Sequence, residues 1–245
     1  MTPNTGFRAG AIAPMECLKA GWATIKDRYW LFLGITLVAM LIGGAVPIVV
    51  IGPMMCGLYL CLFAKMRGEQ VQFDQLFKGF DYFVPGLVAA AIQTVPILIL
   101  VIAADAIYFV FMFVIMPHDR YSRGQAPPPV FFLGLIVFVL FVMIVSLTIH
   151  TLFLFAYPLI VVRKLSGWDA IQTSYRAAVK NIGGIVGLIL LNVGLGIVGV
   201  ICCYVGVFFV MPVSFAAYAV AYRQVFPEVS QNFASPPPPP GNWAA

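Results

Sequence analysis

The stretch FVPGLVAAAIQTVPILILVIAADAIYFVFMFVIM, residues Phe83–Met116, holds a single charged side chain, that of Asp105. A run of roughly 20 apolar residues is enough for a helix to cross a bilayer, and this stretch is longer. A helix on the surface of a soluble protein carries a polar stripe with a period of about 3.6 residues, because one face meets water. No such stripe is present here. Three other stretches have the same character, and His150 is the only side chain in them that becomes charged at moderate pH: Tyr29–Ala64, Val130–Val162 and Ile182–Tyr222. The sequence therefore predicts an all-α fold, a polytopic membrane helical bundle.

The composition excludes a water-soluble fold. The chain of 245 residues is 62% hydrophobic and 9% charged, and its mean hydropathy is +1.00, whereas soluble domains carry about 25% charged residues. The net charge of +5 is interpreted as an excess of Lys and Arg in cytoplasmic loops. No nucleic-acid partner is expected, because no basic patch alternates with exposed aromatic residues. The cysteines show no CxxC spacing and are interpreted as small core residues, so no metal site, disulfide framework or cofactor is expected.

The lengths of the four stretches predict six crossings. The first stretch is too long for one helix and is expected to turn at Gly43, Gly44 and Pro47, because glycine tolerates chain reversal and proline suits the first turn of a helix. The last stretch is expected to divide near Val198–Cys202. Each of the two middle stretches is predicted to be one long, tilted span.

The distribution of basic residues predicts the orientation. With both chain ends in the cytoplasm, every Lys and Arg lies on the cytoplasmic side except Arg120 and Arg123, which is the bias typical of inner-membrane proteins. The chain is expected to divide into a cytoplasmic N-terminal segment with an interfacial helix (1–28), a six-span transmembrane domain (29–222) and a cytoplasmic proline-rich tail (223–245). The predicted location is a bacterial inner membrane.

Two parts of the chain resemble each other. Cys17–Met66 and Trp168–Val225 each contain a polar and aromatic segment, a long apolar hairpin and a basic end, which indicates a parallel repeat. Met15–Arg28 and Gly167–Asn181 are predicted to be amphipathic helices at the membrane surface, or alternatively cytoplasmic extensions of the spans that follow. Phe73–Phe83 is a third candidate, because its aromatic residues suit the interface.

Three proline features are distinctive. Pro53 and Pro212, each placed mid-way along the second helix of a predicted hairpin, are candidate helix kinks because proline removes a backbone donor; close packing of the small residues beside them is the alternative interpretation. The tail Ser235–Asn242, SPPPPPGN, predicts polyproline II conformation. It serves either as a flexible spacer or as a docking peptide for an aromatic groove.

Polar groups inside the apolar stretches are the candidate functional residues. An ionisable side chain in a span is costly to bury and marks a site by default, which singles out Asp105 and His150. The helical rise places them at depths that differ by about 15 Å, so a direct proton relay is not favoured, and a bond from His150 to a neighbouring helix is the alternative. Gln93 and Asn192 are expected to join helices or to line a narrow polar path.

Four segments in a fixed order carry a resemblance to a known family: GWATIKDRYW (21–30), GPMMCGLYL (52–60), MRGEQVQFDQLFKGFDYF (66–83) and PLIVVRKLSGWDAIQTSYRAAVKN (158–181). They are similar to uncharacterised six-helix bacterial inner-membrane proteins, classed as domains of unknown function, and to the membrane domain attached to some glycerophosphodiester phosphodiesterases. The resemblance spans Met15 to Phe226 and implies a six-helix membrane fold. A counterpart of the phosphodiesterase catalytic domain is not expected, so the resemblance implies no reaction.

These patterns predict a non-enzymatic membrane protein. No nucleophile–base set, metal cluster or phosphate-binding loop is apparent in the sequence. We therefore expect an accessory or scaffold subunit of a membrane complex, surrounded by lipid and associated with itself or with another membrane protein. The alternative is a small transporter or channel-like protein with a polar path near Asp105 and His150. A dry bundle with an exposed apolar groove favours the subunit, and a water-accessible cavity reaching either residue favours the transporter.

Overall fold

The computed structural model describes residues 6–46, 48–110, 129–201 and 205–227, and this part of the chain is helical, without a strand. The predicted all-α class is therefore confirmed. Predicted features at Pro47, Arg120, Arg123 and Ser235–Asn242 lie outside the described residues. The helices in chain order are α1 (Pro14–Ile25), η1 (Lys26–Arg28), α2 (Tyr29–Ala45), α3 (Ile51–Met66), η2 (Phe73–Tyr82), α4 (Phe83–Val110), α6 (Pro129–Leu152), α7 (Ala156–Arg163), α8 (Gly167–Lys180), α9 (Ile182–Ile201) and α10 (Gly206–Val225).

Five helical segments are long and apolar enough to cross a membrane, as judged by length and composition: Pro14–Ala45, Phe73–Val110, Phe132–Arg163, Ile182–Ile201 and Gly206–Val225. Helix α3 is apolar but shorter, with 16 residues. Because α1 and η1 run directly into α2, the first segment begins at Pro14 and not at Tyr29. The long apolar helices are compatible with a membrane protein, and the count of six crossings stays a prediction.

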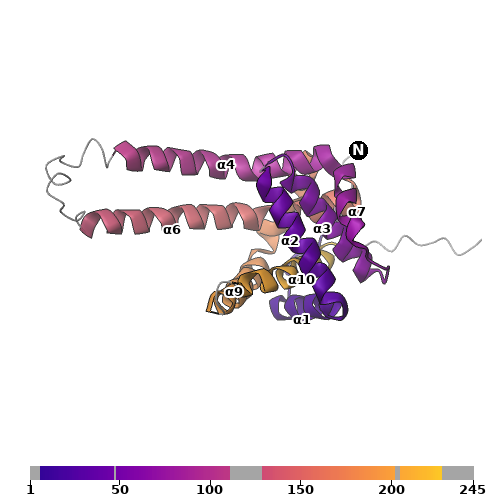
Figure 1. Ribbon diagram of the computed structural model, residues 1–245. Coiled ribbons are helices and arrows are strands. Elements are labelled where there is room, and N and C mark those ends of the chain that lie inside the picture. Colours follow the sequence, from indigo (N-terminus) through magenta and orange to yellow (C-terminus); the bar gives the residue numbers. More distant parts are fainter. Residues whose placement is uncertain (1–5, 47, 111–128, 202–204, 228–245) are drawn as a thin grey trace, which may run out of the picture.

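The molecule consists of a body and an arm (Figure 1). Helices α4 and α6 lie side by side and project together from one side of a group formed by the other helices. Their inner ends belong to the body: Ala89 and Ala90 of α4 are buried. Further out, large apolar side chains are exposed on both helices, among them Ile107 at 71% and Ile144 at 63%. The arm therefore carries an apolar surface that nothing in the chain's described part covers.

The predicted turns fall close to the observed ones. The first hairpin reverses between Ala45 and Ile51, just after Gly43 and Gly44. The second reverses between Ile201 and Gly206, at the end of the predicted interval. The stretch expected to be one span over 130–162 is interrupted by a turn at 153–155, and the short helix α7 follows the turn. Each half of the predicted repeat thus has the same order, a short helix followed by a helical hairpin.

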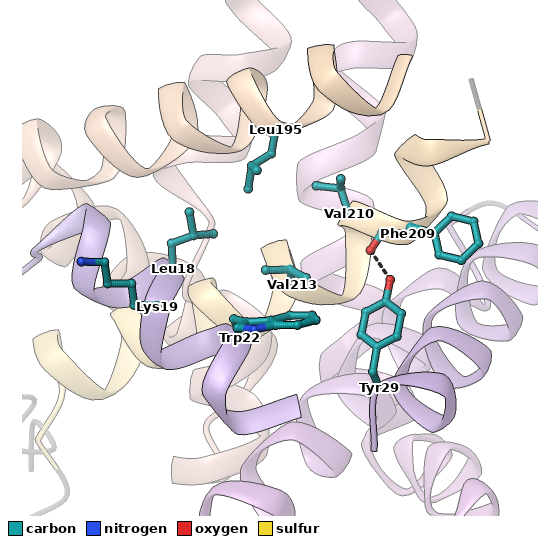
Figure 2. Close-up of a pocket in the computed structure, with 8 residues that line it drawn as sticks. All are labelled: Leu18, Lys19, Trp22, Tyr29, Leu195, Phe209, Val210 and Val213. Atoms are coloured by element: carbon teal, nitrogen blue, oxygen red, sulfur yellow. Dashed lines mark hydrogen bonds between the residues drawn. The ribbon is translucent and has the colours of Figure 1, made fainter. Parts of the chain in front are cut away.

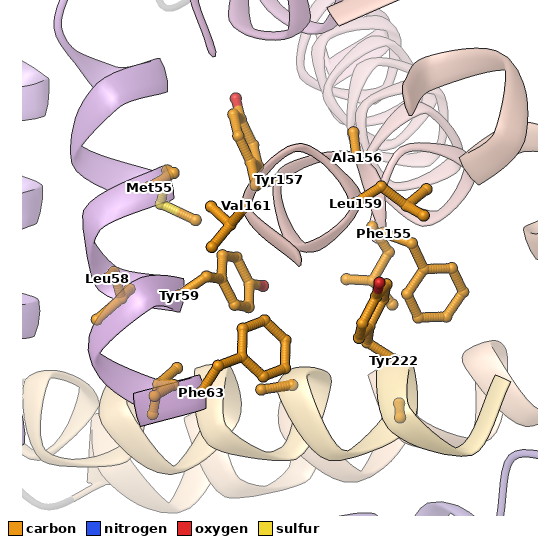
Figure 3. Packing of buried hydrophobic residues seen from close by; sticks show 14 of the residues in the cluster. Met55, Leu58, Tyr59, Phe63, Phe155, Ala156, Tyr157, Leu159, Val161 and Tyr222 are labelled. Carbon is orange, nitrogen blue, oxygen red and sulfur yellow. The ribbon is translucent and has the colours of Figure 1, made fainter. Parts of the chain in front are cut away.

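Helix α3 is the centre of the body. Most of its side chains are buried, among them Met54 at 0% exposure and Phe63 at 3%. The ring of Tyr59 lies 6.4 Å from that of Phe215, and the ring of Phe63 lies 5.4 Å from that of Tyr222, so α3 packs against α10 through aromatic edges. In Figure 3, α3 and α10 cross each other, and α7 is seen nearly end-on between them. These three helices of the body therefore run in different directions.

The contact between α3 and η2 is made backbone to backbone. A Cβ on Gly57 would lie 1.9 Å from the carbonyl oxygen of Leu76, and a Cβ on Gly79 would lie 2.1 Å from the carbonyl oxygen of Pro53. Glycine is the residue that permits this approach, because it has no Cβ. The next turn repeats the arrangement with α4, where Gly52 meets Gly86. Small residues thus place η2 and the start of α4 directly on α3.

Helix α1 packs on the body through its small residues. In α1 the buried side chains are Cys17 and Ile25, with Gly21 between them against the backbone of α10. Trp22 is 46% exposed. The side of α1 that packs on the body is therefore its small-residue side, which leaves the aromatic side outward. Segment 73–82 folds as the 3-10 helix η2 and keeps Phe77 partly exposed.

Both ends of the described chain meet at one end of the body. The backbone N–H of Arg8 donates to the carbonyl of Val225 at 2.8 Å. Asn181, at the end of α8, accepts from the N–H of Ala11 and donates to the carbonyl of Arg8, both at 3.0 Å. Lys65, at the end of α3, forms an ion pair with Asp27 of η1. The first described residues, the end of α8 and the end of α10 thus lie together.

We expect Gly57→Ala to destabilise the protein, because its methyl group needs the space of the Leu76 carbonyl. Overpacking of this kind costs about 1–3 kcal/mol. The matched control is Gly44→Ala in α2, whose Cβ would meet nothing within 4 Å. Thermal unfolding of the purified protein in mild detergent measures both. Equal midpoints for the two variants would contradict the close contact.

Candidate functional site at the base of the arm

Three polar side chains meet where the arm joins the body. Gln93 of α4 places its Nε2 3.3 Å from Nδ1 of His150 in α6. The hydroxyl of Tyr157 in α7 donates to Oε1 of Gln93 at 3.4 Å. An amide nitrogen only donates, so Nδ1 accepts and the neutral imidazole carries its proton on Nε2. The three residues form one hydrogen-bonded chain across three helices, and we call them the arm-base cluster.

The break between α6 and α7 positions Tyr157. Ser174 of α8 closes this break, since its hydroxyl donates to the carbonyl of Leu152 at 2.9 Å and accepts from the N–H of Phe155 at 3.1 Å. The last carbonyls of one helix and the first amides of the next are the groups that lack intrahelical partners. Pro158, in the first turn of α7, has no backbone N–H and therefore needs no acceptor there. A single buried serine therefore holds the turn that aims Tyr157 at Gln93.

Aromatic groups surround the cluster. The ring of Tyr218 in α10 lies 6.2 Å from the imidazole of His150 in an edge-on arrangement. Tyr157 is 7% exposed and Tyr59 2% exposed, whereas Gln93 is half-buried. Figure 3 shows Tyr157 and Tyr59 projecting from α7 and α3 within the same packed region. The cluster runs from the buried Tyr157 through the half-buried Gln93 to His150, which is exposed. Its hydrogen bonds join α7, α4 and α6.

Asp105 is not part of the cluster. It is exposed on the outer half of α4, twelve residues beyond Gln93, which corresponds to about 18 Å along the helix. The structure therefore places Asp105 and His150 apart, as the depth argument predicts. It gives His150 a partner on a neighbouring helix, which was the other expectation.

The remaining predicted residues lie elsewhere. Asn192 of α9 donates to the carbonyl of Leu188 at 2.9 Å, and its Oδ1 is buried without a partner in the described part of the chain. Pro53 lies in the first turn of α3, so the expected mid-helix position is wrong, and no backbone bond is lost there. Pro212 lies inside α10, which continues through it. Among the described residues no group of His, Cys, Asp or Glu is arranged to hold a metal ion.

The pairing of Gln93 with His150 was missed, although the sequence contains its signal. Counted from Phe83, Gln93 lies about 15 Å along its helix, and counted back from Val162, His150 lies about 18 Å along its own. The two therefore have nearly equal depth on adjacent antiparallel helices. Tyr157 has no comparable signal, because its place depends on the turn at 153–155.

We expect the single variants Gln93→Leu and His150→Leu to show energetic coupling. Each removes the same hydrogen bond, so the double variant should lose about 0.5–1.5 kcal/mol less stability than the sum of the two. The control pair, Gln93→Leu with Asp105→Leu, should be additive because the residues are far apart. Unfolding in detergent measures the five variants against the parent protein, and additivity of the first pair would rule the bond out.

Comparisons with known proteins do not test the family resemblance. No protein-family model matches the chain, and no match is found among curated proteins or solved structures.

Proposed function

We propose that this chain is a non-enzymatic membrane scaffold, an accessory subunit that holds a partner through its arm. The observation that carries the proposal is the contrast between the two parts of the molecule. The body is closely packed around α3, whereas the arm exposes large apolar side chains on both helices. In a bilayer such a surface is covered by lipid or by other membrane helices.

One position on the arm favours a helix as the partner. Asp105 is exposed, and so are its neighbours Ala103 and Ala106. Small residues let helices approach closely, and a polar side chain between them forms hydrogen bonds across the interface. A carboxylate facing hydrocarbon is costly, so a partner that donates a hydrogen bond to it is favoured over lipid. We name this surface the Asp105 face.

A small transporter is the second candidate, and the arm-base cluster favours it. Tyr157, Gln93 and His150 make a continuous hydrogen-bonded chain inside apolar helices, the kind of group that occurs in proton pathways. A polar path that includes Asp105 would have to span the roughly 18 Å along α4 that separate Gln93 from Asp105. Asp105→Asn, which keeps a small polar side chain, should preserve assembly of a scaffold and impair a proton-coupled transporter.

The proposed location is a bacterial inner membrane with both chain ends in the cytoplasm. Support comes from the Lys and Arg distribution in the sequence and from the contacts that bring Arg8 and Lys180 to the same end of the body. Lys180 lies over the ring of Phe7 at 5.6 Å. Positive charge collected at one end of apolar helices is typical of the cytoplasmic side.

The orientation predicts which positions react from outside the cell. We expect Ser122→Cys to be labelled by a membrane-impermeant maleimide in intact cells, and Gln75→Cys only after the membrane is opened. Replacing Cys202 and Cys203 by serine removes the native thiols that lie outside the described residues. The reverse labelling pattern would invert the proposed topology.

The Asp105 face predicts a specific cross-link. In the same background, Ala106→Cys should form an intermolecular disulfide or cross-link in native membranes, and adding Asp105→Leu should reduce its yield several-fold. The matched control is Ile144→Cys, on an exposed part of α6. Equal yields from both cysteines would indicate random collision and contradict the proposed face.

A further inference from the structure

A groove opens on the surface of the body between α1, α9 and α10 (Figure 2). Its volume is about 570 Å³, within the range of sites that hold small organic ligands. The walls are almost entirely apolar, and they are formed by Leu18, Trp22, Leu195, Phe209, Val210 and Val213. This groove is separate from the arm-base cluster and from the Asp105 face.

One hydrogen bond holds the far wall of the groove. The hydroxyl of Tyr29 donates to the backbone carbonyl of Phe209 at 2.6 Å, as Figure 2 shows. The hydroxyl of Tyr29 is thus satisfied within the protein. The groove is left with little polar character of its own.

The exception is Lys19, which lies at the edge of the groove on α1. It is exposed, and in the described part of the chain no carboxylate lies close enough to form an ion pair with it. Glu16, one turn earlier, is exposed as well and makes no such contact. Beside Lys19 stands Trp22, a residue type enriched where hydrocarbon meets the headgroups. An apolar slot with a cation at its mouth is complementary to an amphiphile with an anionic head.

We propose that this groove binds an anionic diacyl phospholipid, with an acyl chain between α1 and α10 and its phosphate at Lys19. The proposal rests on membrane residence and is independent of any partner at the Asp105 face. It predicts a preference for phosphatidylglycerol over phosphatidylcholine, because one lysine near an anionic headgroup favours binding by about fivefold. Zwitterionic lipid offers the same acyl chain without the net charge.

Trp22 is the reporter for the test. In a variant with Trp30, Trp168 and Trp243 changed to Phe, acyl chains brominated along their length quench only Trp22. The protein is reconstituted in vesicles with brominated phosphatidylglycerol or brominated phosphatidylcholine, and the quenching curves give relative binding constants. The expected result is about fivefold stronger binding of the anionic lipid, reduced to parity in Lys19→Gln. Lys26→Gln, which removes an exposed lysine outside the groove, should leave the preference unchanged.

Each of the other possible quenching results contradicts the proposed lipid site. Equal quenching by the two lipids in the parent protein means that Trp22 reports the lipid around the whole protein and not a lipid bound in the groove. Quenching by neither means that protein, from a second copy or from this chain, covers the groove. If the preference for the anionic lipid persists in Lys19→Gln, then Lys19 does not bind the headgroup. Because the arm cross-link is measured separately, loss of the lipid site leaves the scaffold proposal standing, and loss of the cross-link leaves the lipid site standing.

Discussion

The closest contact in the body is the one between α3 and η2, and the rest of the arrangement depends on it. Gly57 and Gly79 let two backbones touch, with carbonyl oxygens where side chains would otherwise be. In lipid there is little hydrophobic drive between helices, so close packing of this kind supplies much of their association. Once η2 is fixed on α3, the start of α4 is fixed too, because the chain runs from Tyr82 into Phe83 without a loop.

The arm contacts the body near its base, where α4 packs on α3 and α8. Near the base, α4 meets α3 through Gly52 and Gly86 and meets α6 and α7 through the arm-base cluster. Farther from the body, α4 and α6 contact mainly each other. In a bilayer, exposed apolar side chains cost little because hydrocarbon surrounds them. Unpaired backbone N–H and C=O groups would be costly there. The two arm helices satisfy their own backbones and can therefore extend away from the body.

Composition and run length were enough to predict the all-α class, the long apolar helices and both hairpin turns, because these depend on local chain properties. The crossing of helices in the body was not predictable in the same way. The break before α7 depends on Ser174, which is distant in sequence and bonds to Leu152 and Phe155. The side of α1 that packs on α10 had no signal in the hydrophobic pattern, because the contact is made by the small surface of Gly21. For the candidate site, depth arithmetic was sufficient for Gln93 and His150 but not for Tyr157.

The bond between Arg8 and Val225 has a consequence for biosynthesis. The ribosome delivers the N-terminal segment first, and domains generally fold as they emerge. Here the earliest residues have their partners at the far end of the chain: Arg8 pairs with Val225, and Gly21 lies on the backbone of Ala217. Helix α1 therefore lacks its partner along this side until α10, about 200 residues later in the sequence, has been translated. The contact between α1 and α10 is one of the last that the described part of the chain can form.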